Sequence, residues 1–156
     1  MMRLMLSGEE ILLDNEDLDL FNAYSWWVLR VKNLKYIVGR HGKSKGCRVL
    51  FHRVLMPEAE VVDHINGNGL DNRKDNLRGC SHAENMRNRN ISRKNKSGFK
   101  GVYWHKADKL WKAQLKYNGK RVLDQSCKSA EEAARLYDKF ALKYHGEFAK
   151  TNFNYA

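Results

Sequence analysis

The alternation of apolar and polar positions divides the chain into three parts with different predicted elements. In residues 1–56, short apolar or aromatic runs are separated by turn residues, which predicts a β-rich segment. The predicted strands are Ile11–Leu13, Tyr24–Val31, Tyr36–Val38 and Cys47–Phe51. The glycine- and lysine-rich stretch 39–46 predicts a hairpin loop, which either contacts phosphates or is a solvated turn.

Residues 57–90 predict a compact frame of two short strands, a loop and a helix. In order, these are a strand at Val61–Val62, a loop over 66–75, a strand at Asn76–Arg78 and a helix from His82 to about Asn90. Ser81 and Glu84 have the spacing of a capping box, which fixes the start of the helix. Asn85 then lies in its first turns and can point back towards Asp63-His64, where the first strand ends.

Residues 99–153 predict a three-stranded antiparallel sheet packed on one helix. The strands are Val102–His105, Leu110–Tyr117 and Lys120–Ser126, and the helix runs from a capping box at Ser129 and Glu132 to Tyr144 or His145, where Gly146 ends it. Asn118-Gly119 is a strong hairpin signal. The helix is expected to cover the apolar face of the sheet and to leave a Lys/Gln face open. Residues 91–98 predict a basic linker, either an arm along a phosphate backbone or a flexible tether.

Charge then points to a polyanionic partner. The chain of 156 residues has 29 Lys+Arg against 18 Asp+Glu, a net charge of +11. Bases dominate residues 23–56 and 87–100, which contain no acid, whereas residues 1–22 hold six acids. This segregation favours nucleic acid over a merely solvated surface. The acidic start either shields the basic face or is solvated.

Cysteine usage and hydropathy restrict the compartment. Three widely spaced cysteines without a Cys-x-x-Cys pair argue against a zinc knuckle and favour a reducing environment. No apolar run is long enough to cross a membrane, and the apolar start is too short for a signal peptide. We therefore expect a soluble, intracellular and cytoplasmic protein without a membrane partner.

The adjacent pair Asp63-His64 is the chemical centre of the sequence. The carboxylate is a hard oxygen ligand for a divalent cation, and the imidazole beside it can take a proton from water. Together they provide the parts needed to hydrolyse a phosphodiester with one metal ion. His52, upstream, is either a helper near the phosphate or a hydrogen-bonded histidine at the edge of the domain.

The segment from His52 to Asn90 resembles the HNH endonuclease family in its phage and intron homing form. The matching residues are His52-Arg53, Val62–Gly67, Asp71–Arg73, Asn76–Arg78 and Glu84-Asn85. The resemblance implies that His64 is the general base and that Asn76 braces the loop and orients His64. It also implies that Asp63 and Asn85 hold one Mg²⁺ or Mn²⁺, with His82 as a weaker competing ligand. Arg53 and Arg78 either contact phosphate or form structural ion pairs.

The segment from Ser97 to Phe153 resembles the plant ethylene-response (Apetala-type) DNA-binding domain, in which the open face of the sheet enters the major groove. By position, this resemblance implies DNA contacts from Lys100, Tyr103, His105, Gln114, Lys116 and Arg121. Tyr103 and His105 stand where that family usually has arginines, and Leu123 where it has tryptophan, so base preference does not carry over. The linker region adds expected backbone contacts from Arg87, Arg89, Arg93, Lys94 and Lys96.

The sequence therefore predicts an α+β protein with a small ββα-metal nuclease domain followed by a three-stranded sheet packed on one helix. The expected domains are 1–90 with a nuclease core at 52–90, a linker at 91–98, and a DNA-binding domain at 99–156. The predicted activity is metal-dependent cleavage of double-stranded DNA by a monomer of the homing type, with no protein partner. The alternatives are a non-catalytic DNA-binding regulator and an RNA-binding protein.

Overall fold

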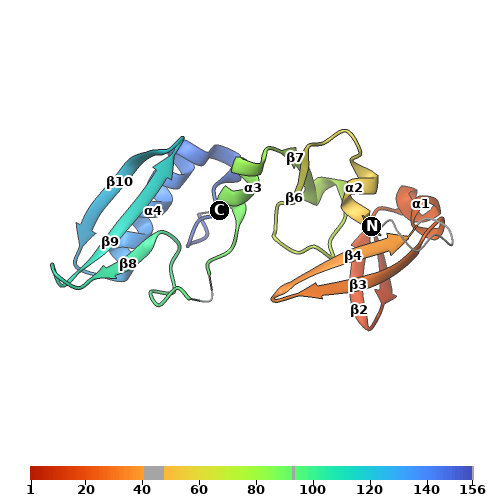
Figure 1. Cartoon of the computed structure of the whole chain (residues 1–156), viewed down its shortest axis with the longest axis horizontal. Coiled ribbons are helices and arrows are strands. Elements are labelled where there is room, and N and C mark those ends of the chain that lie inside the picture. The colour runs from red at the N-terminus through yellow and green to blue at the C-terminus, as the bar shows by residue number, and fades with distance from the viewer. Residues whose placement is uncertain (41–47, 93, 156) are drawn as a thin grey trace. The chain divides into compact units, whose positions relative to one another are not determined.

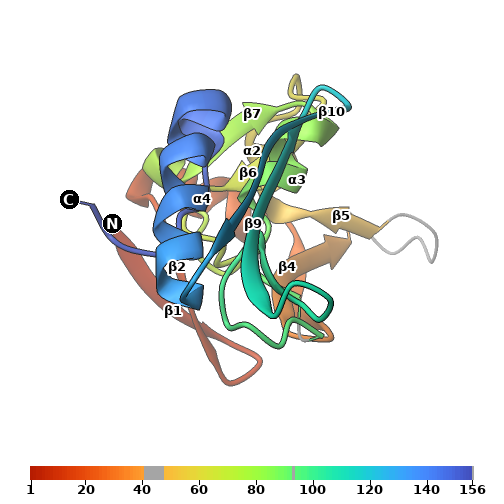
Figure 2. The ribbon, with the colours of Figure 1, turned by 90° about the vertical axis from the view of Figure 1, so that its left-hand side faces the viewer.

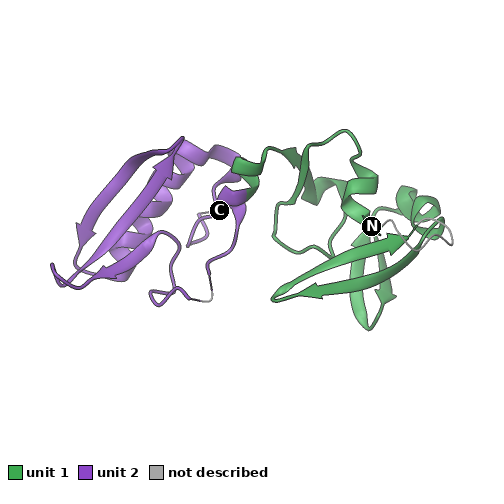
Figure 3. Cartoon of the chain, viewed as in Figure 1, with its two compact units in different colours: residues 1–85 green, residues 86–156 purple. Residues whose placement is uncertain are grey.

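The chain consists of two compact units. The computed structural model describes residues 1–40, 48–92 and 94–155. The first unit comprises residues 1–85 and the second residues 86–156 (Figure 3). The division falls inside helix α3 (His82–Asn88). The predicted α+β class is confirmed, because small antiparallel sheets and helices coexist in the described residues.

In residues 1–40 and 48–85, the first unit is built from three antiparallel sheets and short helices (Figure 1). Its strands and helices are β1 (Met2–Leu6), β2 (Glu9–Leu13), α1 (Leu18–Asn22), β3 (Ser25–Val31), β4 (Leu34–Arg40), β5 (Arg48–Leu50), α2 (Phe51–Leu55), β6 (Val61–His64), β7 (Leu77–Cys80) and the start of α3. Strands β1 and β2 form a hairpin, β3, β4 and β5 a second sheet in that order, and β6 and β7 a third. Apolar side chains from β2, β3, β4 and α2 form one core, centred on Ile11, Leu13, Val28, Ile37 and Phe51.

Two parts of this unit differ from the prediction. The strand expected at Cys47–Phe51 is shorter, because β5 ends at Leu50 and helix α2 begins at Phe51. Strand β1 was not predicted; its alternate residues Met2, Leu4 and Leu6 pack against the core. Most of the predicted basic loop at 39–46 lies outside the described residues, while its first two residues belong to β4.

The N-terminal acids are used within the unit. Glu9 pairs with Arg30 and Lys35 at 2.7 and 2.8 Å. Lys74, in the long loop between β6 and β7, forms ion pairs with Glu16 and Asp17. Glu9, Glu16 and Asp17 therefore bind basic residues of the same unit.

The second unit contains a three-stranded sheet with β9 at its centre. Its elements are β8 (Val102–His105), β9 (Leu110–Tyr117), β10 (Lys120–Cys127) and α4 (Ala130–His145). The strand bounds agree with the prediction to within one residue, and Asn118 and Gly119 both have positive φ, as their hairpin requires. Ser129 Oγ accepts from the Glu132 amide at 3.1 Å, which confirms the capping box.

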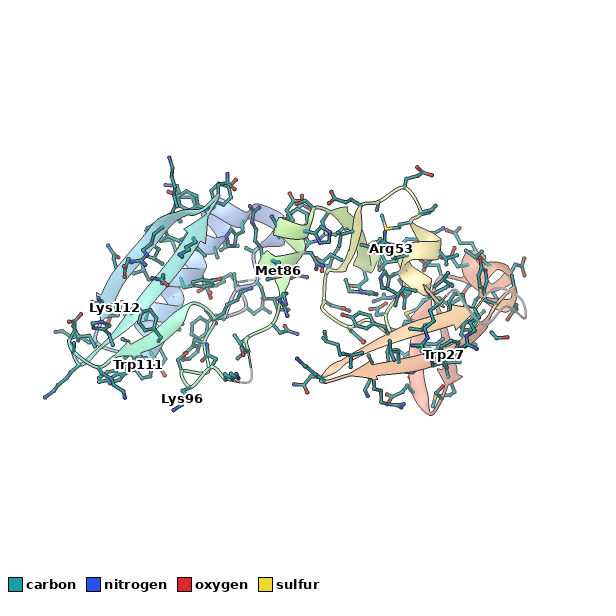
Figure 4. All side chains as sticks on the ribbon, in the orientation of Figure 1. Trp27, Arg53, Met86, Lys96, Trp111 and Lys112 are labelled. Atoms are coloured by element: carbon teal, nitrogen blue, oxygen red, sulfur yellow. The ribbon has the colours of Figure 1, made fainter. Side chains whose placement is uncertain are left out.

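Helix α4 covers one face of this sheet (Figures 1 and 2). Its Ala133, Ala134, Tyr137 and Ala141 join Ala113, Leu115 and Leu123 in a buried core. The alternate positions of β9, which include Lys112 (labelled in Figure 4), lie on the opposite face. Both the covering helix and the open polar face were predicted from the alternation of β9.

The predicted linker is partly folded into this second unit. Asn95 Nδ2 donates to the Phe99 carbonyl at 2.8 Å, and Ser97 Oγ donates to the Val102 carbonyl at 2.8 Å. These bonds form a compact turn over 95–99, so this half of the segment is neither an extended arm nor a free tether. None of the helices in the described part of the chain is long and apolar enough to span a membrane.

Candidate active site

Asp63 and His64 end strand β6, whose four residues are all buried. Asp63 is 6% exposed, and its Oδ2 accepts from Arg78 Nη2 at 2.8 Å and Nε at 3.1 Å. Arg78 is also the cross-strand partner of Asp63 in the β6–β7 ladder. Of the two interpretations of Arg78, the structure therefore shows the ion pair, formed with the acid of the central Asp-His pair.

The imidazole of His64 forms a hydrogen bond with the loop that follows strand β6. Its Nε2 lies 3.2 Å from Asn72 Oδ1. An amide oxygen only accepts, so Nε2 carries the proton in this contact, and the neutral ring has its lone pair on Nδ1. Of the two ring nitrogens, Nδ1 is therefore the basic one.

The environment of His64 favours the neutral ring. Burial lowers its pKa below the ordinary value, while the hydrogen bond that the ring donates to Asn72 and the charges of Asp63 and Asp71 act in the opposite direction. Burial is the largest of these influences. The imidazole is thus uncharged at neutral pH, which is the form that a general base requires.

Asn72 is a site residue that sequence reasoning missed. Its side chain is fully buried, and its Nδ2 donates to the Gly69 carbonyl at 3.3 Å, which turns Oδ1 towards His64. Its backbone amide donates to the Leu12 carbonyl at 2.8 Å, and the Leu12 amide donates to the Leu70 carbonyl at 2.9 Å. The edge of β2 therefore fixes the loop that holds His64. No local pattern in the sequence predicts the backbone pairing of Leu12 with Asn72, because the two residues lie far apart along the chain.

Asn76 braces the loop. Its Oδ1 accepts from the Asn66 amide at 3.0 Å, and its Nδ2 donates to the Asp71 carbonyl at 2.8 Å. Asp71 in turn binds Arg73 through two bonds of 2.8 and 2.7 Å. These bonds close the Asn-rich segment over itself, in keeping with the bracing role suggested for Asn76. Its effect on the orientation of His64 stays a prediction.

The loop also approaches β4 very closely. A Cβ atom at Gly69 would lie 2.2 Å from the Lys35 carbonyl oxygen and 2.6 Å from the Tyr36 ring. Only glycine therefore fits at this point of contact between the loop and the N-terminal sheet.

His52 differs from one of the two interpretations given to it, and the other, a helper near the phosphate, stays a prediction. It is 6% exposed, its ring packs on His64, and its Nδ1 has no hydrogen-bond partner. It is thus neither at the edge of the domain nor held by a hydrogen bond at Nδ1. Its neighbour Arg53 is exposed on α2 and donates to the Glu60 carbonyl at 3.3 Å (Figure 4).

Asn85 lies in α3, which begins at the predicted capping box. Ser81 Oγ accepts from the Glu84 amide at 3.3 Å, and the Ser81 amide donates to Glu84 Oε2 at 2.9 Å. Asn85 is half-buried, whereas the side chain of the competing ligand His82 is 82% exposed and lies 3.9 Å from Glu60. Within residues 1–40, 48–92 and 94–155, no three His, Cys, Asp or Glu side chains are arranged to hold a metal ion. The expected pair of one carboxylate and one amide stays a prediction.

The residues expected to contact DNA are used in different ways. Lys100 is the clearest departure, because its Nζ donates to the carbonyl oxygens of Arg87 and Arg89. Burial lowers its pKa to about 8. The ammonium group thus serves inside the second unit, on carbonyl partners from residues more than ten positions earlier in the chain. Its contact with DNA stays a prediction.

Several other predicted contacts are engaged with neighbours. The Arg87 guanidinium lies 4.8 Å above the Tyr117 ring. His105 pairs with Asp108 at 3.0 Å, and Arg121 pairs with Asp124 at 2.6 Å. Among the described residues, the remaining predicted contacts form no ion pair with an acid. They are Arg89, Lys94 and Lys96 near the predicted linker, and Tyr103, Gln114 and Lys116 in the sheet. Arg93 lies outside the described residues.

Lys112, which was expected on the open face but not among the DNA contacts, pairs with Asp108 at 3.1 Å and stands opposite Tyr103 in the β8–β9 ladder. The open face of the sheet therefore combines basic, amide and aromatic groups with the acids Asp108 and Asp124.

Residues 49–87, which include the whole Asp63-His64 loop, match the HNH endonuclease family. The chain is also 34% identical over 95 residues to protein 3.8 of Escherichia phage T7, across 61% of this chain and 78% of that protein. The chain belongs to the HNH endonucleases. This HNH endonuclease is further similar to an uncharacterized HNH endonuclease, L560, of Acanthamoeba polyphaga mimivirus, with 27% identity over 134 residues, 85% of this chain and 69% of the relative. No solved structure gives a significant match.

Membership of this family shows that the protein is a DNA endonuclease of the HNH type, with DNA as its substrate. The resemblance of the second unit to an Apetala-type domain stays a prediction.

Proposed function

We propose that the protein is a metal-dependent DNA endonuclease of the homing type, whose first unit hydrolyses the phosphodiester and whose second unit binds the duplex. The observation that carries the proposal is the buried Asp63-His64 pair with His64 Nε2 3.2 Å from Asn72. A neutral imidazole oriented by a hydrogen bond at Nε2 has the form that a general base requires.

In this proposal His64 is the general base. Nδ1 takes a proton from the attacking water, while Asn72 retains the hydrogen bond at Nε2 and keeps the ring in one tautomer. As the ring becomes positively charged, the nearby carboxylates of Asp63 and Asp71 stabilise it. Asn76 acts through the loop and does not touch the reacting atoms.

Asp63 and Asn85 would hold one Mg²⁺ or Mn²⁺. The fit rests on donor chemistry, since a carboxylate and an amide supply the hard oxygens that these ions prefer. A bound divalent ion supplies positive charge that stabilises the phosphorane and the leaving oxygen. Because Arg78 already offsets the charge of Asp63, the protein alone offers this ion little net negative charge. We therefore expect DNA phosphate to complete the site.

The second unit would bind DNA through the open face of its sheet. Support comes from the net charge of +11 and from the face that carries Tyr103, Gln114 and Lys116 opposite helix α4. A two-stranded or three-stranded β surface of this kind fits a DNA groove. The homing type rests on the resemblance of the Asp63–Asn85 motif, and a monomer is the expected state.

The activity is tested with supercoiled plasmids that contain random inserts, incubated with wild-type protein and Mg²⁺, Mn²⁺ or EDTA. Cleavage with either metal and none with EDTA is expected. His64→Ala should abolish cutting, whereas His82→Ala, at an exposed histidine of the same unit, should leave it intact. Equal cutting by His64→Ala and wild type would remove the general base, and metal-independent cutting would remove the metal. Sequencing the cleaved ends then shows whether a defined site is chosen.

A further inference from the structure

Strand β2 begins a short parallel ladder with the loop that carries Asn72. Leu12 is bridged to Asp71 in the parallel direction. Its amide donates to the Leu70 carbonyl at 2.9 Å, and its carbonyl accepts from the Asn72 amide at 2.8 Å. One step further along such a ladder, the backbone carbonyl of residue 14 would accept from the amide of residue 74.

Asp14 makes this next contact with its side chain instead of its backbone. Its Oδ2 accepts from the Lys74 amide at 2.8 Å. Its backbone carbonyl accepts from the Asp17 amide at 3.1 Å, within the 3-10 helix η1 (Asn15–Asp17). The carbonyl is thus engaged in a local turn, and the carboxylate replaces it in the contact with the loop.

The local position of Asp14 does not account for this orientation. It is the N-cap residue of η1, from which an aspartate usually accepts from an amide of its own helix, yet its side chain forms no such bond. Lys74 is the first residue of the 3-10 helix η2 (Lys74–Asn76), where an amide has no partner within the helix, and the side chain of the preceding Arg73 does not cap it. Asp14 therefore caps η2 and not η1.

Helix η2 leads directly to the strand end that carries His64. The backbone carbonyl of Asn76, the last residue of η2, accepts from the Ile65 amide at 2.9 Å. At the other end of the same segment, Asn72 Oδ1 lies 3.2 Å from His64 Nε2. Asn72 and Asn76 therefore both contact the end of β6, and Asp14 binds the backbone between them.

We infer that Asp14 is a positioning residue for DNA cleavage, whose carboxylate holds η2 and with it the loop that orients His64. This inference rests on the role of His64 in the proposed function. A carboxylate suits the task because an ionised acceptor binds a backbone amide more strongly than a neutral one. The Lys74 ammonium also pairs with Glu16, but both of these side chains are largely exposed, so this ion pair is expected to contribute less.

Two substitutions of Asp14 test the hydrogen bond. Asp14→Ala removes the oxygen that binds the Lys74 amide, whereas Asp14→Asn keeps a side-chain oxygen there. A displacement of about 1 Å at a reacting group costs roughly 100-fold in rate. We expect kcat for plasmid cleavage to fall about 10-fold in Asp14→Ala with KM unchanged, and to stay within about threefold of wild type in Asp14→Asn. Asp19→Ala, at an exposed acid of α1, is the matched control and should cut like wild type.

Lys74→Pro removes the same bond from the other side. Proline fits the first position of a helix, and the preceding Arg73 has the extended backbone that proline requires. Lys74→Ala keeps the amide and corrects for loss of the ammonium. Relative to Lys74→Ala, Lys74→Pro should lower kcat about as much as Asp14→Ala does, and the double variant of Asp14→Ala with Lys74→Pro should lower it no further. Multiplying losses in the double variant would overturn the inference.

Two further measurements do not depend on cleavage. Hydrogen exchange of the Lys74 amide should be slow in wild type and Asp14→Asn and faster in Asp14→Ala. In ¹H–¹⁵N spectra of the His64 ring, wild type should show the tautomer protonated at Nε2, and Asp14→Ala should shift these signals because the loop that carries Asn72 moves.

Three results would overturn the positioning role. They are unchanged exchange of the Lys74 amide in Asp14→Ala, His64 ring signals in Asp14→Ala that match those of wild type, and a loss of kcat in Asp14→Asn as large as in Asp14→Ala. The last result would show that the charge of Asp14 matters and not its bond to the amide. Wild type inactive with every metal would count against the proposed function alone, because the exchange and the ring spectra would still decide the inference.

Discussion

Mild acid should destabilise the first unit through His52. Burial holds the pKa of this histidine at about 3 in the folded protein, whereas in the unfolded chain it returns to the ordinary value of 6.5. Between these two values the unfolded state binds a proton that the folded state does not. The stability that depends on a neutral His52 is therefore complete above pH 6.5 and is lost progressively as the pH falls towards 3.

The size of the effect at pH 5 follows from the unfolded value. The pH then lies about 1.5 units below the pKa of His52 in the unfolded chain. Because each unit corresponds to about 1.4 kcal/mol, protonation of the unfolded state lowers the free energy of unfolding by about 2 kcal/mol. The figure hardly depends on the folded pKa, because folded His52 is still neutral at pH 5. His64, whose pKa is also lowered by burial, acts in the same direction.

The assay is urea unfolding at pH 7 and at pH 5, read by pulsed hydrogen–deuterium exchange at a fixed pH. Peptides from residues 1–85 and 86–156 are followed separately, so the two units are measured in one sample. Between the two pH values, the free energy of unfolding of the first unit should fall by at least about 2 kcal/mol in wild type. In His52→Phe the fall should be about 2 kcal/mol smaller. The second unit should respond equally in both proteins. An equal loss of stability in wild type and His52→Phe would refute the reasoning.

Three further predictions follow from particular contacts. Asn72→Ala removes the group that holds His64 Nε2 and should lower kcat by about 10- to 100-fold, while gel shifts show unchanged DNA binding; a normal kcat would contradict this role. Calorimetry with Mg²⁺ should show no tight binding without DNA, because Arg78 neutralises Asp63, and a micromolar site in the free protein would disprove it. In the second unit, buried Asp138 accepts bonds from the Asn152 amide at 2.8 Å and side chain at 2.9 Å. Asp138→Ala should therefore lower the stability of this unit by about 3 kcal/mol in urea unfolding, whereas the exposed Asp124→Ala should change it little.

Local patterns predicted the elements that local forces determine. The alternation of β9, the Asn118-Gly119 turn and the Ser129 capping box each act within a few residues, and all were found where expected. Helix α2 was missed because it has only five residues, too few for a helical period to show. The pair Asp63-His64 was correctly placed at a strand end, because the loop that follows it is rich in Asn and Gly.

Contacts between distant segments could not be read in this way. Asn72 binds His64 because the Leu12 backbone pairs with the loop. The ring of His52 contacts His64 because α2 packs beside β6. Lys100 was expected to face DNA because of its position in the resemblance to the Apetala-type domain, and the fold places its ammonium on backbone carbonyls. In each case the residue type was visible in the sequence, and its partner was set by tertiary structure.

The backbone pairing of Leu12 with Leu70 and Asn72 bears on how this nuclease module can be transplanted. If only residues 49–87, the span shared with the family, were transferred to another protein, His64 would lose the edge of β2 that fixes Asn72. The Asn72 amide and the Leu70 carbonyl would then turn to solvent. The smallest transferable nuclease fragment of this protein therefore includes strand β2 as well as the motif itself.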